Sequence, residues 1–384
     1  MVRPARGRDF AVASGSTPRG ADSRLARSPP LGKGGGSRDR PALAGRAEDF
    51  GEVRSPQTAG GPEQKRYPAS RMGILGPMAH PRSPHYTFLD LGDEILIAVA
   101  RLDGDGICNS GLVGLGSGGI VFDTGLTTHA ARDLRGAFDL HFHRSPTLVA
   151  NSHRHMDHTL GNGTFEGLPI WGTRRTREIL LERLDDLSAE LRREQLENDL
   201  RELEAQRGEA RTDSARADFD LFIQITRALL NSAEAARIVP PDQTFESRLP
   251  LDGRAGAELR SFGSGHTEAD AVLFLARERM LFTGDLALVG VQPSMGSGEP
   301  RHWLEVLDEL DRLGAERIVP GHGPVAGPEG IDETRRYLAA VLKAAEAPPT
   351  APLPGELRPW EGSPTLRENL RFVRDWLAQT GDRP

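Results

Sequence analysis

Asn151-Ser-His-Arg-His-Met-Asp-His158 places four potential metal ligands within six residues: His153, His155, Asp157 and His158. The apolar run Thr147-Leu-Val-Ala150 just before this stretch predicts a short strand, so the ligands belong on the loop that leaves its carboxyl end. Alternation along that loop can direct the first two histidines toward one centre, and the last two ligands can then reach a second centre. Neutral imidazole and carboxylate are ligands of borderline and hard divalent metals. The stretch therefore predicts a metal site.

Three more candidate ligands follow later in the chain, each in a glycine-containing turn. They are His266 in Gly263-Ser-Gly-His-Thr267, Asp285 in Phe282-Thr-Gly-Asp285 and His322 in Pro320-Gly-His-Gly-Pro324. An apolar run that predicts a strand precedes each turn, so all these side chains are expected just beyond the carboxyl ends of strands, where one cluster can assemble. Glycine permits the close backbone approach that a metal loop needs. A histidine taken singly would usually be a core residue, but this shared context favours ligands.

The ordered series of seven residues resembles the metal-binding signature of the metallo-β-lactamase-fold hydrolases, over about residues 88–325. The resemblance implies an α/β protein with the four-layer αββα sandwich of that family. It assigns His153, His155 and His266 to one metal, Asp157, His158 and His322 to the other, and Asp285 to a bridging position between them. The implied cofactors are two Zn²⁺ ions, with iron or manganese as alternatives.

Metal-dependent hydrolysis is the chemistry that this resemblance implies. A hydroxide held between two divalent ions ~3.5–4 Å apart is a nucleophile at neutral pH, and the ions also stabilise the oxyanion that develops. Asp157 is the expected catalytic proton acceptor or donor. The expected reaction is cleavage of a small ester, thioester, lactone or related bond. The alternatives are β-lactam or phosphodiester hydrolysis at the same site, or a non-hydrolytic metal-binding or redox protein of the same fold.

Two ligand positions narrow the class within this resemblance. Asp285 stands where the commonest β-lactamase subgroup has Cys, so antibiotic hydrolysis is not favoured. His155 stands where flavin-linked diiron relatives have Glu, which points to zinc. Thr267-Glu-Ala-Asp270 and Thr283-Gly-Asp-Leu286 look most like the glyoxalase II-like branch. The chain departs from true glyoxalase II because it lacks an obvious C-terminal glutathione-binding domain, which leaves a glutathione thioester in doubt as the substrate.

The segment between His158 and His266 is much longer than a simple strand-helix-strand step needs. Leucines at helical spacing from Leu180 onwards, and a second stripe between Phe219 and Leu230, predict amphipathic helices. We expect a helical insertion at about 174–237, which forms a lid, a substrate wall or a homodimer surface; the alternative is a hairpin that only packs on the body. Further helices are expected at about 331–380.

Four smaller features are interpreted as follows. Phe122-Asp-Thr-Gly125 resembles the family's strand-ending Asp-Thr-Gly, in which the Asp supports the metal loop, although an ordinary turn is the alternative. Gly114-x-Gly116-x-x-Gly119 matches a dinucleotide fingerprint, but a strand rather than a helix is expected after it, which excludes that use. His141 and His143 are predicted to be strand residues. The other histidines are expected to be ordinary surface or loop residues: His80, His85, His129 and His302.

The composition separates a basic tail from an acidic body. Residues 1–71 contain 14 Lys or Arg and 7 Asp or Glu, whereas the remainder contains 34 and 48. The tail is rich in Gly, Pro, Ser and Arg without apolar periodicity, which predicts a disordered segment and leaves 72–384 as the hydrolase domain. The acidic body argues against nucleic acid as a partner. A small-molecule substrate is expected instead.

Membrane association and disulfide formation are not expected. The chain has no run of 18 or more apolar residues, so no segment is predicted to span a membrane. The single cysteine, Cys108, provides no intramolecular disulfide and no thiolate metal cluster. It is compatible with a reducing compartment, and a cytoplasmic location is therefore expected.

Overall fold

A computed structural model of the chain describes residues 81–185, 192–232 and 237–380. The tail predicted at 1–71 lies outside the described residues. Within the described part, no helix has both the length and the apolar character needed to cross a membrane.

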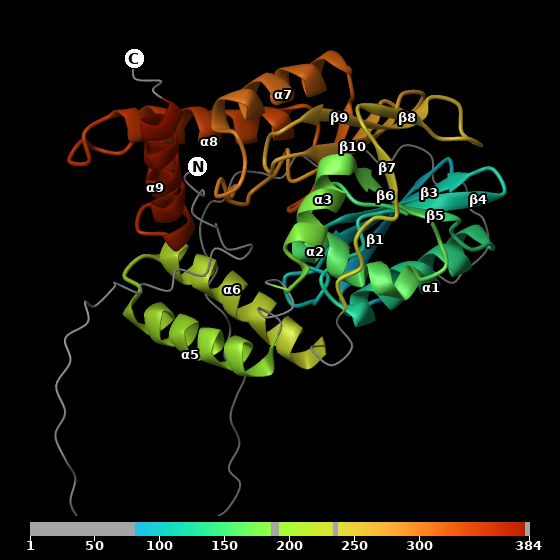
Figure 1. The fold of residues 1–384 in the computed structure, drawn as a ribbon, viewed down its shortest axis with the longest axis horizontal. Helices are drawn as coiled ribbons and strands as arrows, with labels where there is room; N and C mark the ends of the chain where they lie inside the picture. The colour runs from blue at the N-terminus through green and yellow to red at the C-terminus, as the bar shows by residue number, and fades with distance from the viewer. Residues whose placement is uncertain (1–80, 186–191, 233–236, 381–384) are drawn as a thin grey trace, which may run out of the picture. The chain divides into compact units, whose positions relative to one another are not determined.

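One sheet contains seven strands that are arranged in chain order (Figure 1). They are β1 (Tyr86–Gly92), β2 (Ile95–Ala100), β3 (Ser110–Leu115), β4 (Gly118–Phe122), β5 (Leu148–Ala150), β6 (Ile170–Thr173) and β7 (Gln243–Phe245). The first four strands pair antiparallel, and β4 to β7 pair parallel. The parallel half of this sheet carries the histidine-rich loop at the carboxyl end of β5.

A second sheet contains five strands in the order β12-β11-β10-β9-β8. They are β8 (Arg248–Pro250), β9 (Ala257–Gly263), β10 (Asp270–Leu275), β11 (Met280–Gly284) and β12 (Arg317–Pro320). All neighbours pair antiparallel except β11 and β12, which are parallel. The ends of β11 and β12 therefore lie at the same edge, where the turns containing Asp285 and His322 begin.

Alternating side chains explain why the two sheets stack. In β2, Ile95 and Ile97 belong to the core between the sheets, whereas Leu96 faces the opposite layer. In β10, Leu273 belongs to the same inner core and Phe274 belongs to the outer one. Because successive strand residues point to opposite faces, a strand that is apolar on both faces needs cover on both sides. One face meets the other sheet and the other face meets helices.

The helices supply the two outer layers. Helix α1 (Thr128–Phe142) packs on the outer face of the first sheet through residues that include Leu134 and Phe138. Helices α7 (Pro300–Arg312) and α8 (Glu329–Glu346) pack on the outer face of the second sheet, and α9 (Pro364–Thr380) packs beside α8. The predicted αββα sandwich is confirmed, and helices are present in the predicted C-terminal region.

Helix α1 corrects one expectation from the sequence. His141 lies in this helix and His143 caps its carboxyl end in the left-handed conformation, so neither is a strand residue. The helical pattern was present in the sequence, because Ala130, Leu134 and Phe138 recur at intervals of four. The Thr127 side chain accepts a hydrogen bond from the Ala130 backbone N–H and begins the helix.

The region predicted as an insertion is helical in its described residues. It contains α3 (Arg174–Glu182), α5 (Arg193–Glu209) and α6 (Asp213–Ser232). Leu196 of α5 and Ile225 of α6 share an apolar cluster with Ile107 and Met156 of the body. The Gln224 side chain also donates a hydrogen bond to the Gly104 carbonyl at 2.7 Å. The insertion is thus packed directly against the loops that carry the candidate ligands.

Candidate metal centre

The seven predicted ligands come from four neighbouring loop regions at the carboxyl ends of strands. His153 and His155 follow β5, and Asp157 and His158 lie in the short helix α2 (Met156–Thr159) that comes next. The other three come from the second sheet: His266 follows β9, Asp285 follows β11 and His322 follows β12. Packing of the two sheets brings these loops together into two adjoining groups of potential ligands.

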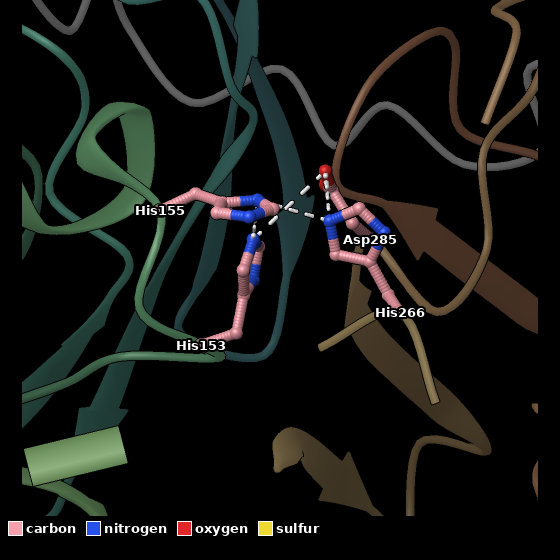
Figure 2. A group of neighbouring side chains, drawn as sticks. All are labelled: His153, His155, His266 and Asp285. Carbon is pink, nitrogen blue, oxygen red and sulfur yellow. Dashed lines mark hydrogen bonds and ion pairs between the residues drawn. The ribbon is translucent and has the colours of Figure 1, made fainter. Parts of the chain in front are cut away.

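The first group consists of His153, His155, His266 and Asp285 (Figure 2). The Nδ1 atom of His155 lies 3.0 Å from Nε2 of His153 and 3.0 Å from Nε2 of His266. The Oδ2 atom of Asp285 lies 3.4 Å from Nε2 of His266 and 4.0 Å from Nε2 of His153. Three imidazole nitrogens and one carboxylate oxygen therefore converge on one small volume.

The second group consists of Asp157, His158 and His322. Oδ2 of Asp157 lies 3.1 Å from Nε2 of His322 and 3.4 Å from Nε2 of His158. Asp285 also contacts this group, but with its other oxygen: Oδ1 lies 3.2 Å from Nε2 of His158 and 3.4 Å from Nε2 of His322. Asp285 thus presents one carboxylate oxygen to each group.

Hydrogen bonds on the far sides of the rings fix which nitrogen faces inward. Nδ1 of His158 lies 2.9 Å from Oδ2 of Asp123, and Nδ1 of His322 lies 3.1 Å from the carbonyl oxygen of Ile107. A carboxylate and a carbonyl only accept, so Nδ1 carries a proton in both rings and Nε2 is the nitrogen that faces inward, where a metal would displace its proton. In the first group, Nδ1 of His153 contacts the Ser152 hydroxyl at 2.9 Å.

Asp123 therefore occupies the supporting position expected from Phe122-Asp-Thr-Gly125. Besides contacting His158, its Oδ1 accepts a hydrogen bond from the Ser152 backbone N–H at 2.7 Å. Asp123 is buried and has φ of 61°, a left-handed conformation that is uncommon for a residue other than glycine. Both carboxylate oxygens are thus used to hold the loop that carries the first four candidate ligands.

Burial and charge act differently on the two groups. Burial, together with neighbouring imidazoles, lowers the pKa of His153 and His155 well below the usual value. Burial also lowers the pKa of His266 to about 4 despite the nearby Asp285 carboxylate. These three rings are neutral at pH 7, which is the form that binds a metal.

The histidines of the second group have the opposite shift. Burial acts to lower the pKa of His158 and His322, but nearby carboxylates, with Cys108 in addition for His158, outweigh it and hold both values well above normal. Burial likewise acts to raise the pKa of Asp157 and Asp285, and the same histidines hold both values well below normal. Ionised carboxylates in a buried site favour a bound cation.

Two observations test whether a metal fits these residues. Nε2 of His158 and Oδ1 of Asp285 are buried and have no hydrogen-bond partner, although they lie 3.2 Å apart. In addition, Nδ1 of His155 lies within hydrogen-bond distance of two other ring nitrogens. A ring nitrogen carries at most one hydrogen, so it cannot donate a hydrogen bond to both. Unpartnered buried atoms and converging lone pairs are both accounted for by cations at the two groups. The residues therefore fit divalent metals.

Glycine is required where the His322 turn meets Asp285. A Cβ atom on Gly321 would lie 2.0 Å from Oδ1 of Asp285, and one on Gly284 would lie 2.5 Å from Cβ of Ser152. Gly284 also has φ of 51°, which is strained for other residues. These two glycines let the loops approach closely enough for Asp285 to reach both groups.

Asn109 holds the His322 turn and was not identified from the sequence. Its side-chain Nδ2 donates to the carbonyls of Pro320 at 2.9 Å and Gly323 at 2.8 Å, and its backbone N–H donates to Gly321. The neighbouring Ile107 has φ of 66°, although its β-branched side chain disfavours that conformation. No local pattern could reveal these contacts, because the partners lie more than 200 residues away in sequence.

The His266 turn is held by a different set of contacts. The Asp270 carboxylate accepts hydrogen bonds from the Thr267 backbone N–H at 3.0 Å and from its hydroxyl at 2.8 Å. The Trp303 ring lies edge-on to the His266 ring, with 5.2 Å between the centroids. His302 was expected to be an ordinary surface or loop residue, but it lies in α7 and its Nδ1 contacts the Ser264 carbonyl of this turn.

The remaining described histidines lie outside the two groups. His85 accepts a hydrogen bond from the Asp105 backbone N–H and lies 4.0 Å from its carboxylate, and His129 is exposed at the start of α1. His141 pairs with Asp90 at 3.7 Å. His80 lies outside the described residues. Neither these three described histidines nor His143 belongs to a candidate ligand group.

Comparisons with known proteins agree with this fold. A family model described as the Metallo-beta-lactamase superfamily matches residues 103–322, which include all seven candidate ligands. A search of curated proteins gave no match. Solved structures with a similar fold include the metallo-beta-lactamase FIM-1 from Pseudomonas aeruginosa in its mono-zinc form, with 15% identity, a TM-score of 0.47, and coverage of 68% of this chain and 98% of that one.

Two further structures have a comparable likeness. The metallo-beta-lactamase from Pontibacter korlensis has 16% identity and a TM-score of 0.47, with 66% of this chain and 99% of that one covered. The metallo-beta-lactamase from Erythrobacter litoralis, with beta mercaptoethanol in the active site, has 15% identity and a TM-score of 0.48, with 67% and 98% covered. The family match spans more than half of the chain. The chain therefore belongs to the metallo-beta-lactamase superfamily and is a metal-dependent hydrolase.

Proposed function

We propose that the protein is a dinuclear zinc hydrolase that cleaves a small ester, thioester, lactone or related bond. The observation that supports two metals rather than one is the position of Asp285. Its Oδ2 faces the three imidazoles of the first group, and its Oδ1 faces His158 and His322 of the second. One carboxylate that serves two groups is suited to a pair of divalent ions.

The residues divide the chemistry between binding and proton transfer. Bound divalent ions would supply a water nucleophile of lowered pKa and an electrophile for a carbonyl oxygen. His153, His155 and His266 would hold one ion, and His158 and His322 would hold the other with Asp157. Asp285 would bridge the pair. Asp123 and the Ile107 carbonyl would hold a proton on Nδ1 of His158 and His322, so that Nε2 of each ring is directed at the ion.

Asp157 is the residue that we propose for proton transfer. Its carboxylate contacts His158 and His322, the other members of the second group, and its side chain is 14% exposed. Nearby histidines hold its pKa well below normal despite burial, so the carboxylate is ionised. A substrate that approaches from solvent at the second group would meet Asp157 before it reached the more buried first group.

The proposed substrate class rests on sequence motifs and on the insertion. Thr267-Glu-Ala-Asp270 and Thr283-Gly-Asp-Leu286 favour the glyoxalase II-like branch, and Asp285 in place of Cys disfavours β-lactams. We propose that the insertion forms a wall of the site, because Leu196 and Ile225 belong to the same buried apolar cluster as Met156, which lies between His155 and Asp157 in the chain. The partners remain predictions: a small-molecule substrate, no nucleic acid or membrane, and a homodimer through the insertion. A cytoplasmic location is also retained as a prediction.

The decisive experiment offers the zinc-loaded protein a panel of substrates. The panel contains a glutathione thioester, a homoserine-type lactone, a chromogenic cephalosporin and an aryl phosphodiester, and the Asp285→Ala variant serves as the blank. We expect turnover of the thioester or the lactone that disappears in the variant. Turnover of only the cephalosporin or the phosphodiester would assign the function to that alternative bond.

Metal analysis separates hydrolysis from the redox alternative. We expect about two equivalents of zinc per chain and no visible absorption band. Bound iron with a visible band and no turnover of any substrate would favour a redox protein instead. A protein that binds no metal would overturn the assignment of the seven ligands.

A further inference from the structure

A second concave site lies outside the metal centre. It is a cavity of about 370 Å³. Its lining includes three arginines, Arg132, Arg135 and Arg237, and two threonines, Thr128 and Thr164. None of the seven candidate metal ligands contributes to it. The lining comes from α1, from the 3-10 helix η1 (Leu160–Phe165) and from Arg237 at the end of the insertion.

The sequence of α1 places its contribution on one helix face. Thr128, Arg132 and Arg135 are separated by four and three residues, which is the spacing of side chains that lie above one another on a helix. Thr128 is in the first turn of this 15-residue helix, where the backbone N–H groups and the helix dipole favour an anion. The arginines thus extend a positive field that begins at the helix terminus.

A neutral contact holds one guanidinium at the cavity. Nη1 of Arg135 donates to the carbonyl of Thr164 in η1 at 2.9 Å. This single bond leaves other N–H groups of the guanidinium available, since arginine has five. Arg135 is therefore oriented by its contact with η1 without losing its charge.

The positive charge of this cavity is weakly compensated. No carboxylate contributes to its lining. Arg237 pairs with Glu166 at 3.4 Å, but both side chains are more than two-thirds exposed, so the pair is weak. Within the described ranges, no salt bridge involves Arg132 or Arg135. Three clustered cations in an otherwise acidic protein repel one another, and a bound anion would remove that repulsion.

We propose that this arginine pocket, formed around Arg132, Arg135 and Arg237, binds a small organic phosphate. A phosphate monoester carries close to two negative charges and several acceptor oxygens, which planar guanidinium groups bind in a fork geometry. The Thr164 hydroxyl is buried and has no hydrogen-bond partner, so it offers a further hydrogen bond to the phosphate or to its alcohol. The volume lies at the lower end of the range for small-molecule sites, which suits a phosphorylated metabolite of a few carbon atoms.

The test is calorimetric titration of the full-length, zinc-loaded protein with glycerol 3-phosphate. Inorganic phosphate is titrated in parallel, and glycerol serves as the uncharged probe. The Arg132→Gln/Arg135→Gln variant removes two of the cations, and Arg174→Gln/Arg175→Gln removes the same charge from exposed positions on α3. Thermal unfolding of both variants checks that each remains folded.

The expected result is binding of glycerol 3-phosphate that weakens by at least about tenfold in the Arg132→Gln/Arg135→Gln variant. The α3 variant should bind as the unchanged protein does, and glycerol should not bind. Binding of inorganic phosphate alone would limit the site to the free anion and overturn the organic ligand. Equal binding by the two double variants, or no binding up to on the order of 10 mM ligand, would overturn the pocket.

A further variant separates this pocket from the metal centre, because phosphate can also bind to metal ions. Asp285→Ala disrupts the proposed bridging ligand and leaves the arginines in place. Glycerol 3-phosphate should therefore bind to this variant with unchanged affinity even though hydrolysis is lost. Loss of binding in Asp285→Ala together with retained binding in Arg132→Gln/Arg135→Gln would assign the phosphate to the metals and overturn the proposal.

Discussion

The two ligand groups share Asp285 but are constructed differently. The first is made mainly of buried imidazoles: the side chains of His153 and His266 are only 1% and 2% exposed. The second is more open, with Asp157 and His322 at 14% and 16% exposure. Burial lowers histidine pKa values in the first group, whereas carboxylates raise them in the second.

The supporting contacts differ in the same way. His153 is supported by the hydroxyl of its neighbour Ser152, so its orientation is set locally. His158 and His322 depend on Asp123 and on the Ile107 carbonyl, which come from distant parts of the chain. We conclude that the His153 ring is oriented within its own loop, whereas the rings of His158 and His322 depend on long-range contacts. The following predictions test this difference.

The largest effect is expected where the groups meet. Gly321→Ala would place a Cβ atom 2.0 Å from Oδ1 of Asp285, so either the carboxylate or the His322 turn must move. Both ions should then be bound poorly, and kcat/KM should fall by at least about 10³-fold, equivalent to ~4 kcal/mol. Zinc content and hydrolysis of the best panel substrate provide the measurement.

Gly136→Ala is the matched control for this substitution. Gly136 lies in α1 and a Cβ atom there would meet nothing within 4 Å, so activity and zinc content should be unchanged. Unfolding stability should rise by about 0.5–1 kcal/mol, since alanine is the better helix former. Normal zinc content in Gly321→Ala would show that Asp285 does not need its close approach to this turn.

Asp123→Asn should weaken the second group selectively. The carboxylate accepts from Ser152 N–H with one oxygen and from His158 Nδ1–H with the other, whereas an amide has only one acceptor oxygen. We expect zinc affinity at the second group to fall by about 10–100-fold, and zinc affinity at the first group to change less. Competition with a chromophoric chelator measures both affinities. Equal weakening of the two sites would contradict the separate support of the groups.

A smaller effect is expected for Asn109→Ala. The change leaves the carbonyls of Pro320 and Gly323 without their side-chain donor, and it removes the acceptor for the Ala100 N–H. The free energy of unfolding should fall by about 1–3 kcal/mol. Zinc affinity at the second group should fall several-fold, because the turn that carries His322 is no longer held in place. A loss of stability in the zinc-free protein alone would show that Asn109 supports the fold and not the site.

The smallest effect is expected for Ser152→Ala. The hydroxyl contacts Nδ1 of His153 at 2.9 Å and, less closely, Nδ1 of His158 at 3.3 Å, but the His153 ring is fully buried and therefore still restricted. Zinc affinity of the first group should fall by no more than about tenfold, the lower limit for loss of such a supporting contact. The same chelator competition measures it. A larger loss than in Asp123→Asn would reverse the proposed contrast between the groups.

The sequence predicted the main architecture through residues with strong local signals. The apolar run Thr147–Ala150 predicted a strand, and the stripe between Phe219 and Leu230 predicted a helix, both of which the structure contains. Helix α1 was missed because small alanines form much of its buried face, and His141 and His143 were assigned to a strand. The arginine pocket was not predicted, since Arg237 lies about a hundred residues from Arg132.

The sequence by itself determined the types of the candidate ligands, their order, and their places just after strands. These properties depend on local chemistry: apolar alternation, glycine turns and the preference of imidazole and carboxylate for metals. The resemblance implied a bridging Asp285, and the tertiary structure shows which carboxylate oxygen faces each group. Only the tertiary structure decided that Asn109 and Ile107 hold the His322 turn. Those contacts join segments far apart in sequence, and they form because burial of two apolar sheet faces against each other brings the loops to one edge.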